Sequence, residues 1–174
     1  MLARTWLDAS PQHRAVLLAT AQPWDAEMRE RIARHQRDRA ERVPGMATLE
    51  VPLHLADAMG AHSHPDTLLV VDCLTLWLTN WRMPAEENRE NYDKNGRLAD
   101  ASHREAAMFL IAIENAKGPV VLVGNEIGLG VIPLGNEVRA FVDALGLLNQ
   151  AVAQACTRVT LMVAGLPLVL KDTQ

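Results

Sequence analysis

Short runs of apolar residues are the main feature of the hydrophobic pattern along this chain. Four of them, with few polar positions, predict strands that are covered on both faces: Arg14–Thr20, Thr67–Leu74, Pro119–Asn125 and Arg158–Ala164. Helical patterns separate these runs along the chain. Such an alternation is typical of an α/β fold in which helices flank a mostly parallel sheet.

Three longer stretches predict helices. Asp25–Arg39 is densely charged, Leu98–Ala116 is followed by a Lys-Gly-Pro stop signal, and Asn136–Cys156 repeats apolar residues at helical spacing. The residues Met1–Asp8 have the pattern of the end of an amphipathic helix. The polar segment Pro84–Gly96 predicts a mobile loop.

The first predicted strand begins after only thirteen residues. In nucleotide-binding α/β proteins a strand and a glycine-rich phosphate loop normally precede such a first helix, and this sequence has neither. We therefore interpret residues 1–174 as a single nucleotide-binding α/β domain that is truncated at its N-terminus.

Composition narrows the class of protein further. Hydrophobic residues make up 49% of the chain, which excludes disorder, and no apolar run is long enough to span a membrane. The net charge of −4 gives no basic footprint for nucleic acid. Neither Cys73 nor Cys156 has metal-ligand spacing, so we interpret both as reduced packing residues of a cytoplasmic protein without a signal peptide.

Polar residues follow three of the predicted strands. In open parallel sheets ligands bind beyond the carboxyl ends of the strands, and this rule selects Ala19-Thr20-Ala21, Asp72 and Asn125-Glu126. A carboxylate at the position of Asp72 suits Mg²⁺ beside a phosphate, or it caps the helix that starts at Leu74. Asn125-Glu126 either belongs to this site or forms a polar turn.

His35 is the strongest candidate for a nucleophile. Arg31 and Arg39 lie four residues before and after it on the charged helix, and Met28 and Ile32 place it beside an apolar stripe. We expect the ring to be partly buried, and the flanking cations to disfavour its charged form. The arrangement suits covalent nucleotidyl transfer to a histidine nitrogen, with arginines that bind phosphate. The alternative is a solvated histidine on an ordinary charged helix.

An ordered series of short motifs runs from about Val16 to Lys171. It includes Leu-Ala-Thr-Ala-Gln at 18–22, Arg-Ile-Ala-Arg-His at 31–35, Asp-Cys-Leu-Thr-Leu-Trp-Leu-Thr-Asn at 72–80 and Gly-Asn-Glu-Ile-Gly-Leu-Gly-Val-Ile-Pro at 124–133. Taken in order, these motifs resemble the bifunctional adenosylcobinamide kinase / adenosylcobinamide-phosphate guanylyltransferase family of cobalamin biosynthesis.

The resemblance implies a RecA-like P-loop NTPase core that here lacks its first strand and P-loop, assembled as a homo-oligomer that we expect to be a trimer. It also implies two reactions. The first phosphorylates adenosylcobinamide with GTP or ATP and Mg²⁺, and the second transfers GMP from GTP to adenosylcobinamide phosphate through a guanylylated histidine. No permanently bound cofactor is expected.

The family's nucleophilic histidine falls on His35. Its GTP contacts fall on Ala19, Thr20, Ala21, Gln36, Arg37, Asp38, Arg39, Glu50 and Asp72. Because the phosphate loop is missing, the alternative is a shortened, catalytically silent homologue that acts as a binding or partner subunit.

Overall fold

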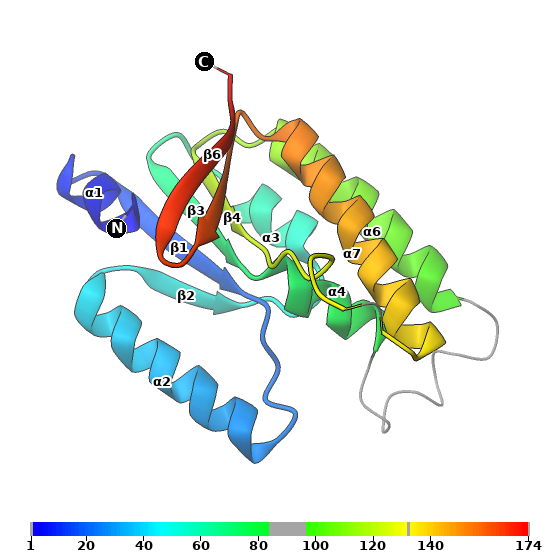
Figure 1. Ribbon diagram of the computed structural model, residues 1–174. Coiled ribbons are helices and arrows are strands. Elements are labelled where there is room, and N and C mark those ends of the chain that lie inside the picture. The colour runs from blue at the N-terminus through cyan, green and yellow to red at the C-terminus, as the bar shows by residue number, and fades with distance from the viewer. Residues whose placement is uncertain (1, 84–96, 132, 174) are drawn as a thin grey trace. The chain divides into compact units, whose positions relative to one another are not determined.

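The computed structural model describes residues 2–83, 97–131 and 133–173, which form two compact units, Met1–Asn125 and Glu126–Gln174 (Figure 1). The predicted loop at 84–96 lies outside the described residues. This division does not decide whether the chain is one domain, and that stays a prediction. None of the described helices has the length and apolar character needed to cross a membrane.

A four-stranded parallel sheet forms the centre of the first unit. Its strands are β1 (Arg14–Ala19), β2 (Ala47–Glu50), β3 (Thr67–Asp72) and β4 (Val120–Val123), in the order β2-β1-β3-β4. The expected α/β fold with a parallel sheet is therefore confirmed. The sequence pattern did not predict β2, because its four residues are mostly exposed and form no apolar run.

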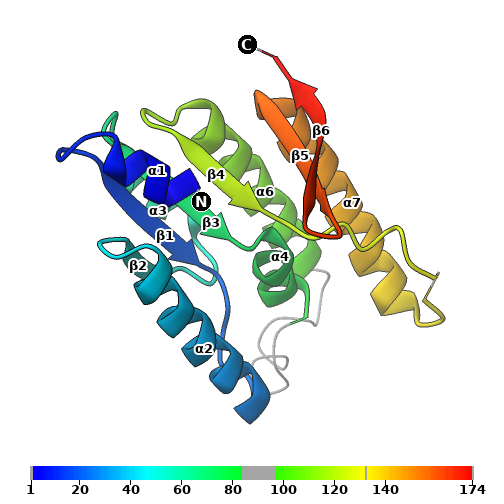
Figure 2. The same cartoon turned by 60° about the vertical axis from the view of Figure 1, so that its left-hand side comes forward.

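Helices flank both faces of this sheet. The helices described in this unit are α1 (Leu2–Asp8), α2 (Ala26–Arg42), α3 (Leu55–His62), α4 (Leu74–Arg82) and α6 (Arg97–Glu114). The α3, α4 and α6 helices cover one face, and α1 lies on the opposite face next to β1 (Figure 2). The indole of Trp6 in α1 stacks on His13 at 3.8 Å between ring centroids and donates a 2.9 Å hydrogen bond to the carbonyl of Arg14.

The core of the first unit lies between the sheet and the helices α3, α4 and α6. Leu18 of β1 and Leu69 of β3 are fully buried, as are Trp77 of α4 and Phe109 of α6, whose rings lie 5.4 Å apart. The two central strands therefore have the burial that their apolar runs predict, whereas β4 is only half-buried.

The second unit contains α7 (Asn136–Ala155) and a hairpin of β5 (Arg158–Val163) and β6 (Leu166–Asp172). The expectation that 158–164 forms a buried parallel strand is wrong, because β5 pairs antiparallel with β6 and is mostly exposed. Both residues of the turn, Ala164 and Gly165, have positive φ angles of 51° and 78°, a backbone shape that suits a tight hairpin.

A substitution at Gly118 tests how closely the turns at the amino ends of β3 and β4 pack. A Cβ atom there would overlap the carbonyl oxygen of His64 and lie 2.7 Å from that of Thr67. We expect Gly118→Ala to lower the free energy of unfolding by about 2 kcal/mol, because backbone atoms would have to shift. Urea unfolding followed by tryptophan fluorescence measures the change.

Gly60→Ala is the matched control for this prediction. Gly60 lies in α3 with open space around its Cβ position, so alanine should raise the free energy of unfolding by about 0.5 kcal/mol. Equal effects of the two substitutions would show that Gly118 is not closely packed.

Candidate active site at the carboxyl ends of the strands

The register of the sheet brings three predicted site residues side by side. Ala19 at the end of β1 is paired with Glu50 of β2 on one side and with Asp72 of β3 on the other. Because residues paired in register point to the same face of a sheet, the three side chains share one face. Adjacent strands lie about 4.8 Å apart, so the Cα atoms of Glu50 and Asp72 are roughly 10 Å apart. We call residues 19–21, Glu50 and Asp72 the strand-end cluster. Both of its carboxylate residues are exposed.

Thr20 is the buried member of the strand-end cluster. Its hydroxyl donates a 2.8 Å hydrogen bond to the carbonyl of Cys73 and accepts one of 2.8 Å from the N–H of the same residue. Its own N–H donates to the carbonyl of Asp72 at 3.0 Å. The side chain is fully buried and its hydroxyl is used within the fold, whereas Ala19 and Ala21 on either side keep some exposed surface.

Asp72 has the position and the freedom of a ligand-binding carboxylate. The N-cap of α4 is Cys73, so Asp72 is not the helix cap that its sequence position also allowed. Its carboxylate makes no hydrogen bond or ion pair with the residues that the structure describes. Mg²⁺ commonly binds one or two protein carboxylates together with substrate phosphates and water. Asp72 fits that role, although the described residues contain no cluster of three metal-ligating side chains.

The surroundings of the two cysteines disfavour a nucleophilic role. Burial raises the pKa of the Cys73 thiol, and the negative charge of Asp72 raises the pKa further. Burial also raises the pKa of Cys156. Because the thiolate is the reactive form, a raised pKa lowers the reactivity of both thiols near neutral pH. Both are free, as expected of packing residues.

The third predicted polar group is divided between the two units. In the first unit, the backbone N–H and the side-chain amide of Asn125 donate to the hydroxyl of Thr75, at 3.1 and 3.0 Å, and so connect β4 with the first turn of α4. In the second unit, the carboxylate of Glu126 accepts hydrogen bonds from Asn149 at 3.3 Å and from the N–H of Gly128 at 3.4 Å. Asn125 therefore supports the end of the sheet, and Glu126 orders the loop that follows it.

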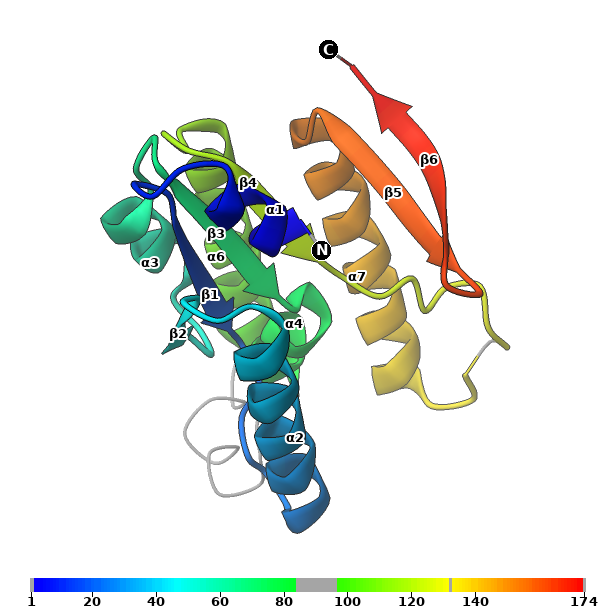
Figure 3. The ribbon, with the colours of Figure 1, turned by 90° about the vertical axis from the view of Figure 1, so that its left-hand side faces the viewer.

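The α2 helix carries His35 and projects from the sheet (Figure 3). Its N-cap is Asp25, whose carboxylate accepts a 2.7 Å hydrogen bond from the N–H of Met28. None of its 17 residues is buried, and His35 is exposed, so the expectation of a partly buried ring is wrong. The reason is that charged residues interrupt every face of the helix, which leaves no continuous apolar stripe to pack.

The surroundings of His35 on α2 are basic. Six arginines and four acidic residues lie on this helix, in a chain whose net charge is −4. Successive helical residues are rotated by about 100°, so Arg31, Asp38 and Arg39 share the side of His35, whereas Gln36 and Arg37 point away from it. A basic helix in an acidic protein attracts anionic ligands.

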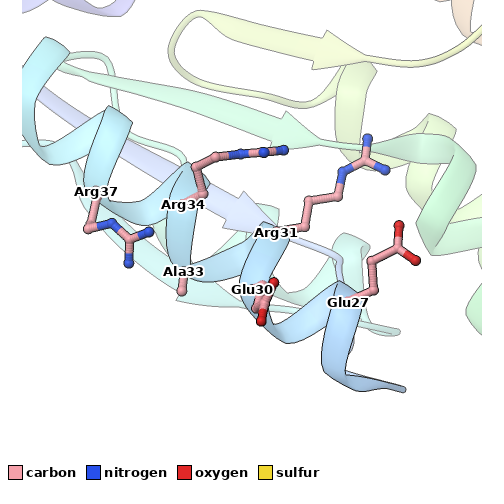
Figure 4. A pocket seen from close by; sticks show the side chains of 6 residues that line it. All are labelled: Glu27, Glu30, Arg31, Ala33, Arg34 and Arg37. Atoms are coloured by element: carbon pink, nitrogen blue, oxygen red, sulfur yellow. The ribbon is translucent and has the colours of Figure 1, made fainter.

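An open depression of about 430 Å³ lies along a neighbouring side of α2 (Figure 4). It is lined by Glu27, Glu30, Arg31, Ala33, Arg34 and Arg37. The side chains of Arg31 and Arg34 extend in the same direction. Of the residues predicted to contact GTP, only Arg37 lines this depression, and His35 does not.

The second unit has a depression of its own, of about 670 Å³, between α7 and the loop after Glu126. Arg139 of α7 shapes this loop, because its guanidinium donates hydrogen bonds to the carbonyls of Pro133 at 3.0 Å and Leu134 at 2.5 Å. The glycines Gly128 and Gly130 of the sequence motif at 124–133 line this depression.

The parallel sheet, with its polar residues gathered at the carboxyl ends of the strands, defines an α/β protein with a RecA-like core. The chain belongs to the cobinamide kinase / cobinamide phosphate guanyltransferase family, whose model matches residues 2–170. The family resemblance in the sequence is thereby confirmed.

Three relatives have closely related names. The chain is 44% identical over 154 residues to the bifunctional adenosylcobalamin biosynthesis protein CobP of Pseudomonas aeruginosa. This alignment covers 88% of this chain and 80% of the relative. It is 30% identical over 156 residues to the bifunctional adenosylcobalamin biosynthesis protein CobU of Escherichia coli. This alignment covers 88% of this chain and 84% of the relative. The protein of the same name from Salmonella typhimurium is 30% identical to this chain over 171 residues, and the alignment covers 97% of this chain and 91% of the relative.

The cap of α2 gives a test of how independent this helix is. Asp25→Ala removes the hydrogen bond to Met28, which should cost about 1 kcal/mol of local helix stability and speed amide exchange in the first turns of α2 about fivefold. The midpoint of global unfolding should hardly move, because α2 buries no side chain.

Hydrogen exchange measured by mass spectrometry checks this prediction. Asp25→Asn keeps a capping oxygen and should exchange like the wild type. A clear fall in the global unfolding midpoint for Asp25→Ala would contradict the independence of α2.

Proposed function

We propose that this chain is a transferase of cobalamin biosynthesis that phosphorylates adenosylcobinamide and then transfers GMP from GTP to the phosphate, giving adenosylcobinamide-GDP. Family membership and the names of the relatives support this activity. The observation that carries the site is the register that sets Ala19 between Glu50 and Asp72 at the carboxyl edge of a parallel sheet.

In the guanylyl transfer, we assign His35 as the nucleophile. A ring nitrogen attacks the α-phosphorus of GTP, the bond from that phosphorus to the bridging oxygen breaks, and pyrophosphate leaves. A phosphate oxygen of adenosylcobinamide phosphate then attacks the same phosphorus, and the phosphorus–nitrogen bond breaks to restore the histidine. Arg31 and Arg39 lie on the same side of α2 and supply positive charge to the phosphoryl oxygens as negative charge develops there. The exposure of His35 leaves it open to both substrates.

The strand-end cluster would hold the nucleotide. A bare carboxylate repels a triphosphate, so Glu50 and Asp72 must act through a cation or as hydrogen-bond acceptors. We assign the Mg²⁺ of the nucleotide to Asp72, and we assign nucleoside N–H or hydroxyl groups to Glu50. The short side chains of Ala19 and Ala21 let the nucleotide approach the backbone between them.

We also propose that the chain assembles as a homo-oligomer, with a trimer as the expected form. Large apolar side chains on the hairpin of the second unit support an interface: Met162, Leu166, Leu168, Val169 and Leu170 are each more than half exposed.

Replacement of His35 tests the proposed covalent step. The chain incubated with Mg²⁺ and GTP labelled at the α-phosphorus should gain an acid-labile GMP adduct, and His35→Ala should reduce that adduct by more than about 100-fold because the attacking nitrogen is gone. Acid quenching followed by mass spectrometry measures the adduct. His64→Ala, which removes another exposed histidine of the same unit, should leave the adduct unchanged. An undiminished adduct in His35→Ala would exclude this residue as the nucleophile.

The two sides of α2 give a second test. Arg39 lies on the side of His35, so Arg39→Ala should slow adduct formation by about tenfold or more through lost charge stabilisation. Arg37 points away from the ring, and Arg37→Ala should slow the same reaction by less than about threefold. Equal slowing in the two variants would mean that the phosphates are not bound on the His35 side of the helix.

A further inference from the structure

The hydrogen bonds that hold the strand-end cluster in place converge on Asn80 in α4. Its side-chain nitrogen donates to the carbonyl of Thr20 at 2.8 Å and to the carbonyl of Pro52 at 2.9 Å. Thr20 directly follows β1, and Pro52 lies two residues beyond Glu50 at the end of β2. One amide group therefore connects two of the three segments that carry the cluster.

Thr20 makes the connection to the third segment. Its hydroxyl bridges the N–H and the carbonyl of Cys73, each at 2.8 Å, directly after Asp72. Pro52, Asn80, Thr20 and Cys73 thus form one continuous series of hydrogen bonds across the ends of β2, β1 and β3. Thr20, Asn80 and Cys73 are 0%, 6% and 8% exposed, so water competes little for these bonds.

The oxygen atom of the Asn80 side-chain amide indicates the role of this residue. Its oxygen is buried and has no hydrogen-bond partner among the described residues. If the amide were flipped, this oxygen would face two carbonyl oxygens, so the two donated hydrogen bonds fix the orientation of the group. An unpaired buried acceptor lowers stability. A gain in stability therefore does not explain this arrangement. Its effect is to hold the carbonyl groups of Thr20 and Pro52 in fixed positions.

Two neighbours of Asn80 hold the same stretch of backbone. The indole N–H groups of Trp77 and Trp81 donate to the carbonyl of Leu53, at 2.6 and 3.3 Å. Residues 77, 80 and 81 lie on one side of α4 because they are three and four positions apart. This side of α4 is thus a rigid support for the backbone that leaves β2.

We propose that Asn80 is a positioning residue for the nucleotide site. It fixes the backbone after β1 and β2 so that Ala19, Glu50 and Asp72 keep the spacing that binds the nucleotide, and it does so without touching the nucleotide. Thr20 is the second positioning residue, through its hydroxyl. This inference rests on the proposed function, which places GTP at the strand-end cluster.

Asn80→Asp tests the proposal with a side chain of the same size. It replaces the two N–H donors with an oxygen that repels both carbonyls. The GTP concentration that gives half-maximal guanylylation of His35 should rise about tenfold, while the maximal rate should change by less than about threefold. Thr20→Val should have the same effect, and Thr20→Ser, which keeps the hydroxyl, should restore the wild-type value. The Thr20 pair keeps the test decisive if Asn80→Asp does not fold.

Ser63→Ala is the matched control. The hydroxyl of Ser63 is buried and accepts a 2.7 Å hydrogen bond from the N–H of Lys117, at the amino ends of β3 and β4. Its loss should lower stability without changing the GTP concentration for half-maximal rate. If Asn80→Asp and Thr20→Val change that concentration no more than Ser63→Ala does, the proposal is overturned.

Amide hydrogen exchange distinguishes a failure of the positioning role of Asn80 from a failure of the proposed function. In Asn80→Asp, the amides of residues 20–22, 51 and 53 should exchange at least about fivefold faster than in Ser63→Ala. A wild-type chain that forms no adduct on His35 overturns the proposed function, and the exchange result then decides on positioning alone. Unchanged exchange at these amides overturns the positioning role.

Discussion

The parallel pairing of β1 with both of its neighbours is the constraint on which the rest of the first unit depends. Hydrogen bonds hold β1 from the N–H of Arg14, which donates to Asp66, to the carbonyl of Ala19, which accepts from Val51. Parallel strands cannot be joined by a tight turn, so the chain must return across the sheet between β1, β2 and β3, and it does so through α2 and α3. The same geometry directs all the carboxyl ends to one edge, which is why polar residues from distant parts of the sequence meet there.

Local pattern was enough to predict the elements that bury their own apolar residues. The strands β1 and β3 are apolar runs in the sequence, and α7 shows its buried residues Phe141, Leu145 and Leu148 at helical spacing. The strand β2 has no such run, because its place is decided by hydrogen bonds to β1. The hairpin of β5 and β6 depends on two consecutive residues of positive φ, one of them an alanine, which the sequence does not reveal.

The candidate site likewise contains some residues that the sequence pattern reveals and others that it does not. Asp72 could be found because it ends an apolar run, and His35 because arginines flank it at helical spacing. The exposure of His35 agrees with the alternative that the sequence left open, a solvated histidine on a charged helix, because α2 buries no side chain. The importance of Asn80 lies in bonds to residues 60 and 28 positions away, and no local pattern contains them. The bonds of the Thr20 hydroxyl to Cys73 likewise cannot be seen from its place between two alanines.

The lack of buried side chains in α2 has a consequence for how this enzyme family can change. Most substitutions within a protein core are limited by the stability that they remove, and that limit is nearly absent on a helix that contributes no side chain to the core. The residues around His35 can therefore vary in charge and size at little cost to folding, whereas Thr20 and Asn80 cannot. Changes in the groups around His35 therefore need no matching change in the sheet that carries Glu50 and Asp72.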